Sequence, residues 1–80
     1  MRILDEESGR SLDRVTIYVT NREALELKDS LEIVIGSNED ARHEHISSED
    51  YQKEITVCLY DPTVLEKFSE RSKKLILEDV

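Results

Sequence analysis

The chain has 80 residues, of which 38% are apolar and 38% charged, and its 11 Lys and Arg against 19 Asp and Glu leave a net charge of −8. This length predicts a single domain, residues 1–80, with little room for a preorganised catalytic pocket. The acidic balance argues against nucleic-acid binding, which needs a basic surface, and no apolar run is long enough to cross a membrane.

Two features indicate a cytoplasmic protein. The first residues contain no apolar run of signal-peptide length. The single cysteine, Cys58, has no partner for an internal disulfide, which suits a reducing compartment.

The first half of the chain predicts two strands and a helix. Residues 2–5 are a short strand candidate, and Gly9 suits the turn that follows. Residues 14–20 alternate β-branched and polar side chains and give the clearest strand signal. Thr20 and Glu23 have capping-box spacing, and a helix from there should end at Gly36. Its expected inner stripe is Ala24, Leu27, Leu31, Val34 and Ile35.

The second half predicts a β-hairpin and a closing helix. Residues 42–46 and 53–60 are the two strands, and Ile55, Val57 and Leu59 share one face of the second. Asp61 and Pro62 suit the start of the last helix, whose inner stripe is Val64, Leu65, Phe68, Ser72, Leu75 and Ile76. The order β-β-α-β-β-α predicts an α+β fold with a mainly antiparallel sheet and helices packed on it.

The sequence His43-Glu44-His45 is a candidate metal site, because alternate residues of a strand project from one face. If Ile46 pairs with Ile55, the register places His43 opposite Cys58, and a zinc-type site of His43, His45 and Cys58 follows. Two solvated histidines are the alternative, and a register shifted by one residue would turn both inward.

Catalysis has weaker support in the sequence. Cys58 with His43 as its base would be a nucleophilic pair, but a strand cysteine with no thiolate-stabilising neighbour is more often structural. No glycine-rich phosphate loop or serine-hydrolase elbow is present. We therefore expect a protein without enzymatic activity.

Two surfaces are candidates for binding a protein. Acidic residues on and after the first helix, namely Glu26, Asp29, Glu39 and Asp40, would attract a basic partner, although a solvated helix face is the alternative. Tyr18 and Tyr60 should lie with the histidines on one sheet face, which the last helix, water or a second copy in a homodimer would cover. These features predict a protein–protein interaction module of inhibitory or regulatory type.

Overall fold

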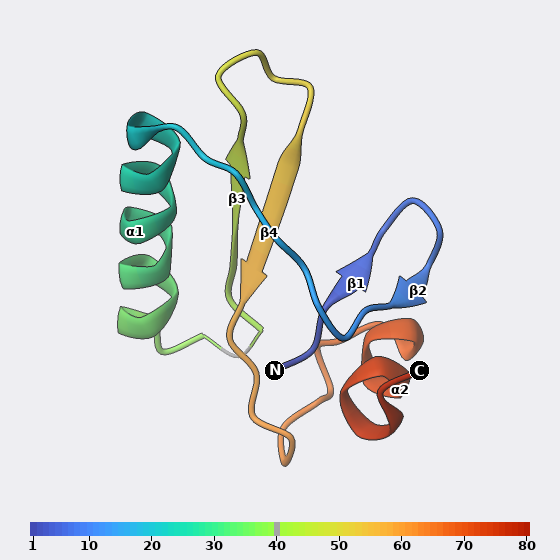
Figure 1. Ribbon diagram of the computed structural model, residues 1–80. Coiled ribbons are helices and arrows are strands. Elements are labelled where there is room, and N and C mark those ends of the chain that lie inside the picture. The colour runs from blue at the N-terminus through green and yellow to red at the C-terminus, as the bar shows by residue number, and fades with distance from the viewer. Residues whose placement is uncertain (40) are drawn as a thin grey trace.

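The computed structural model describes residues 1–39 and 41–80. Its elements are β1 (Leu4–Asp5), β2 (Arg10–Ser11), α1 (Asn21–Gly36), β3 (His43–Ser47), β4 (Glu54–Cys58) and α2 (Glu70–Glu78). The order β-β-α-β-β-α confirms the predicted α+β class. The strands form two separate antiparallel pairs, β1–β2 and β3–β4, and in Figure 1 the β3–β4 pair lies between α1 and the β1–β2 pair.

The larger lobe consists of α1 packed against the β3–β4 hairpin (Figure 1). Thr20 caps α1: its hydroxyl accepts from the Glu23 amide, and the Glu23 carboxylate accepts from the Thr20 amide, as the sequence predicts. The amides of Thr20 and Glu23, which have no partner within the helix, both donate to a side-chain oxygen in this way. The hairpin pairs Ile46 with Ile55, which is the register expected from the sequence.

The predicted apolar stripe of α1 is only partly correct. Leu27 and Val34 face the hairpin, and Val34 is buried. The helix is turned so that three residues expected inside are exposed, namely Leu31 (42%), Ile35 (69%) and Ala24. A two-stranded sheet offers a narrow surface, so it covers only part of a wide apolar stripe.

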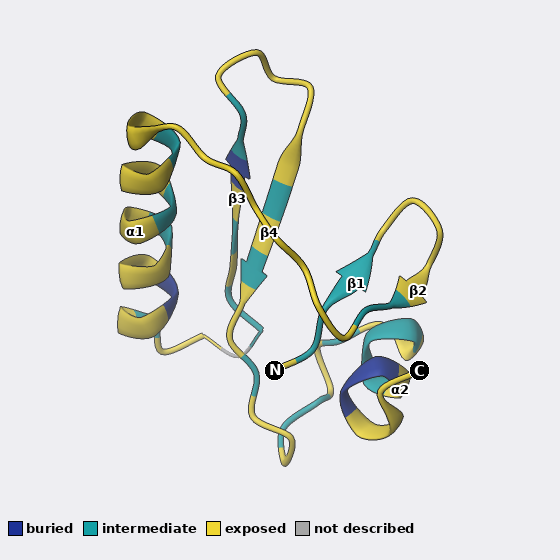
Figure 2. Ribbon diagram, in the orientation of Figure 1, coloured by how far each residue is buried: buried dark blue, intermediate teal, exposed yellow. Residues whose placement is uncertain are grey.

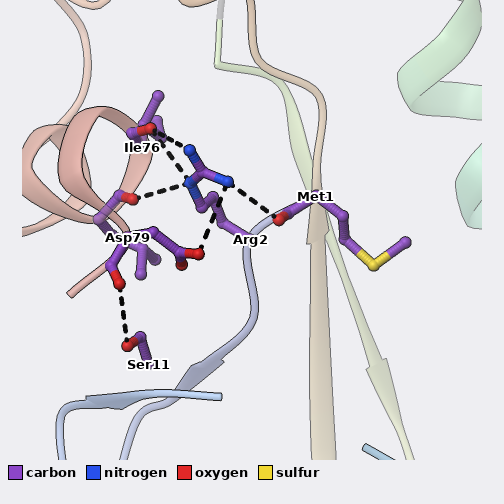
Figure 3. Close-up of polar contacts among 6 residues, drawn as sticks. Met1, Arg2, Ser11, Ile76 and Asp79 are labelled. Carbon is purple, nitrogen blue, oxygen red and sulfur yellow. Dashed lines mark hydrogen bonds and ion pairs between the residues drawn. The ribbon is translucent and has the colours of Figure 1, made fainter. Parts of the chain in front are cut away.

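The smaller lobe consists of the β1–β2 hairpin and α2. Gly9 takes φ 74° in the turn, as its lack of a side chain allows. The guanidinium of Arg2 donates to the carbonyls of Leu75 (3.0 Å) and Ile76 (2.9 Å) at the end of α2 (Figure 3). It also lies 3.9 Å from the Asp79 carboxylate. A residue from the start of the chain therefore caps the last helix.

The clearest predicted strand, residues 14–20, is not a strand in the structure. The segment is extended and crosses β4 on its way to α1 (Figure 1), but it joins neither sheet. Among the described residues, no hydrogen bond of the backbone reaches residues 13–19. The β3–β4 sheet therefore has two strands and lacks the further strand that the alternation in residues 14–20 predicts.

The last helix begins later than expected. Asp61 accepts from the amide and hydroxyl of Thr63, which closes a turn where the helix was predicted to start. Ser69 caps α2 by accepting from the Ser72 amide. The Asp61-Pro62 pair therefore forms a turn, because the Asp61 carboxylate accepts hydrogen bonds from Thr63 instead of capping a helix.

The buried core is small and divided between the lobes (Figure 2). Val34 and Ile46 are buried in the larger lobe, and Leu75 and Ile76 in the smaller one. No described helix has the length and apolar character needed to cross a membrane.

Candidate functional site

A hollow of about 670 Å³ lies between residues 16–20 and the β3–β4 hairpin. We call it the strand hollow. Its apolar lining comes from the extended segment, from α1 and from both strands, and comprises Ile17, Tyr18, Val19, Leu27, Ile46 and Ile55. Much of this apolar surface reaches solvent, since Tyr18 is 92% and Ile17 48% exposed.

The lining of the strand hollow is acidic at the hairpin end. Glu23, Glu49, Asp50 and Glu54 line it, with Lys53 as the only basic side chain among its lining residues. Hydrogen bonds from the Ser48 hydroxyl and the Gln52 amide lower the pKa of Asp50. Amides of Thr20 and Glu49 lower the pKa of Glu23 in the same way. Both carboxylates are therefore held in the charged form at neutral pH.

A second hollow of about 730 Å³ lies between the lobes. It is lined by apolar and charged residues of both lobes, and also by Cys58 and Tyr60. Tyr18 and Tyr60 consequently line different hollows. They do not share one sheet face as expected, because residues 14–20 lie outside the sheet.

The acidic residues singled out from the sequence are separated. Glu26 and Asp29 are exposed on α1, where neither makes an ion pair with another described residue. Glu39 lies 3.7 Å from the Arg42 guanidinium, so part of its charge is offset. Asp40 lies outside the described residues.

The predicted metal ligands lie on the outer face of the β3–β4 hairpin, meaning the face opposite Ile46 and Ile55, from which Cys58 also lines the second hollow. His43 is paired with Cys58 and His45 with Thr56, in the register expected from the sequence. The two imidazole rings meet edge to face with their centroids 5.2 Å apart. His45 Nδ1 lies 2.9 Å from the Glu54 carboxylate and 2.8 Å from the Thr56 hydroxyl.

The surroundings of Cys58 favour the protonated thiol over the thiolate. Its Sγ makes a contact of 3.5 Å with the carbonyl of Leu59. Partial burial raises the pKa of the Cys58 thiol above its ordinary value. The thiolate is the reactive form, so this environment disfavours nucleophilic chemistry.

Three contacts were missed from the sequence. Glu23 also accepts from the Glu49 amide at 2.8 Å and thus ties α1 to the hairpin loop. Glu54 orients His45, and Arg2 caps α2. The Glu54 contact was accessible from the expected register, because Glu54 lies on the same face as His45. Nothing in the sequence indicates the Arg2 contact, which joins residues at opposite ends of the chain.

Comparisons with protein-family models, curated proteins and solved structures give no match to this chain.

Proposed function

We propose that the protein is a small interaction module that binds an extended, basic and apolar segment of another protein in the strand hollow. The observation that carries the proposal is the segment of residues 14–20. It is extended, the backbone groups of residues 14–19 make no hydrogen bond to the described residues, and its β-branched side chains are exposed. Such a backbone is a template for a partner strand.

Charge selects the kind of partner. The chain carries a net charge of −8, and four carboxylates line the strand hollow. A second copy of the chain would bring a further charge of −8 to the interface, whereas Lys and Arg side chains of a partner would be attracted. We therefore favour a basic partner over a homodimer, and an inhibitory or regulatory role in the cytoplasm.

Synthetic peptides test this function directly. Two heptapeptides that alternate Val with Lys or Val with Glu would be titrated into the ¹⁵N-labelled protein. We expect the Lys peptide to shift amide resonances of residues 15–20 and 46–55, because it can add a strand and contact the carboxylates. The Glu peptide should leave them unchanged.

Matched variants locate the binding surface. Ile17→Glu should abolish the shifts, while Leu77→Glu, at another exposed apolar position on α2, should leave them intact. Glu49→Lys with Asp50→Lys should weaken binding of the Lys peptide. If Glu26→Lys with Asp29→Lys weakens it instead, the outer face of α1 is the binding surface and the strand hollow is not. Equal shifts with both peptides, or none with either, would contradict the proposal.

A further inference from the structure

The outer face of the β3–β4 hairpin combines side chains that bind transition metals. His43 and His45 project from one face of β3, and Cys58 of β4 is paired with His43. Directly paired residues of antiparallel strands have Cβ atoms about 4.5–5.5 Å apart, which is within reach of one shared ion. All three residues are exposed, so an ion can approach from solvent.

In both histidines, Nδ1 is held by a hydrogen bond and Nε2 is left available to bind an ion. His45 Nδ1 lies 2.9 Å from the Glu54 carboxylate, and His43 Nδ1 lies 3.3 Å from the carbonyl of Ala41. Carboxylates and carbonyls only accept, so each Nδ1 carries the proton. In the neutral imidazole, each Nε2 then has a free lone pair. Histidines that bind metals commonly have this arrangement, in which a carboxylate or carbonyl holds the other ring nitrogen.

The ring spacing suits one tetrahedral ion. Zinc binds histidine nitrogen at about 2.0–2.1 Å, which puts two rings on the same tetrahedral ion with centroids about 5 Å apart. The centroids of His43 and His45 are 5.2 Å apart. The distance between the two ring centroids is therefore compatible with both rings binding one ion.

Cys58 needs a rotation to complete the set. As the side chains stand, no three His, Cys, Asp or Glu residues in the described part of the chain are close enough to hold an ion. The Cys58 thiol instead makes a weak contact of 3.5 Å with the Leu59 carbonyl. The site therefore requires a different staggered χ1 position of Cys58, one that brings Sγ to the side of its paired residue His43. Metal binding then releases the thiol proton to solvent.

We propose that His43 Nε2, His45 Nε2 and Cys58 Sγ bind one zinc-class divalent ion, with water in the fourth position. A thiolate with two imidazoles selects zinc or cobalt over magnesium and calcium, which prefer oxygen ligands. Glu54 is a positioning residue, since it holds His45 without contacting the ion. This inference does not depend on the proposed function, although Glu54 also lines the edge of the strand hollow.

Cobalt(II) titration of the chelator-treated protein tests the site, because cobalt reports its own coordination in visible absorption. We expect one ion per chain, the intense bands of tetrahedral cobalt and a thiolate-to-cobalt charge-transfer band, all removed by added zinc. Cys58→Ser should remove the charge-transfer band, and His43→Ala with His45→Ala should remove binding. No binding, or octahedral bands without charge transfer, would overturn the proposal.

A matched pair of glutamates tests the role of Glu54. Glu54→Gln should weaken affinity roughly 10–100-fold, as outer-shell partners do, and keep the tetrahedral spectrum. Glu44→Gln, on the opposite face of β3, should change neither. Equal losses in the two variants would contradict the assigned role of Glu54. Zinc-induced shifts of the His43 and His45 amides in the unmodified protein, absent at Tyr51, check the site without relying on any variant.

Discussion

In the smaller lobe, Arg2 makes polar contacts between the two ends of the chain, and Arg71 adds another by donating to the Gly9 carbonyl at 2.7 Å. The last turn of α2 contains no basic residue, so its carbonyl groups have no local cation. Arg2 supplies one from the other end of the chain and donates to two of these carbonyls (Figure 3). Donors and positive charge at a helix C-terminus stabilise it through both hydrogen bonds and the helix dipole.

Replacing this guanidinium should loosen α2. We expect Arg2→Met to lower the free energy of unfolding by about 1–2 kcal/mol, because it removes charged hydrogen bonds from a side chain that is 29% exposed. Arg10→Met removes the same charge from an exposed residue and should have little effect. Urea unfolding followed by circular dichroism measures both. Equal stability of the two variants would show that the Arg2 contacts contribute nothing.

At the scale of elements, Glu23 joins two of them. One carboxylate oxygen accepts from the Thr20 amide in the capping box, and the other accepts from the Glu49 amide in the hairpin loop. The start of α1 is thereby attached to the end of β3. The same bonds hold the pKa of Glu23 below its ordinary value of 4.5.

This attachment should weaken in acid. A carboxylate with a lowered folded-state pKa stabilises the fold above its unfolded pKa, and this stabilisation is lost as the pH falls through the folded-state value. Glu23→Gln keeps a cap but cannot accept from both amides without placing an NH₂ group at one. We expect the variant to unfold at lower urea than the wild type at neutral pH, and the difference to shrink well below pH 4.5.

Urea unfolding midpoints of the wild type and Glu23→Gln at several pH values show whether the stability difference between them shrinks or grows toward acid. A difference that grows toward acid would show that the carboxylate destabilises the fold. Glu26→Gln, on the exposed side of the same helix, serves as the control and should show no such pH dependence.

Local signals in the sequence predicted some elements and failed for others. The capping box at Thr20 and the alternation of Ile55 and Val57 led to the correct α1 boundaries and hairpin register, since both depend on neighbouring residues. The strand at residues 14–20 was wrong because a strand also needs a bonded neighbour, which alternation cannot supply. The face that α1 buries was only partly right, because it depends on the width of the sheet beneath it.

The candidate site shows the same limit. His43, His45 and Cys58 lie on one face of the hairpin. Alternate residues of a strand share a face, and pairing Ile46 with Ile55 sets which residues of the two strands are opposite each other. The prediction that Tyr18 and Tyr60 share one sheet face was wrong, because it required residues 14–20 to be a third strand of the sheet. The strand hollow could not be anticipated, as it arises from the segment that remains unpaired.

At the scale of the whole molecule, stability rests on very few buried side chains. Ile46 is 5% exposed and contributes to the core between α1 and the hairpin. Ile46→Ala should cost about 2–4 kcal/mol through lost burial and the cavity left behind. This is a large part of the total stability of a small domain.

Leu77→Ala is the matched control, because Leu77 is 64% exposed and its truncation should cost little. Urea unfolding of both variants measures the difference. Similar losses at the two positions would show that Ile46 does not hold the lobe together.

The unpaired segment of residues 14–20 also bears on how the protein behaves in concentrated solution. Short β-branched segments with free backbone groups are the units from which cross-β fibrils assemble. Repulsion between chains of net charge −8 opposes this, and it acts over a Debye length of about 10 Å at 0.1 M salt, falling to about 3 Å at 1 M. Colloidal stability should therefore depend on ionic strength, with high salt or acid bringing these segments together and an occupied strand hollow protecting against fibril growth.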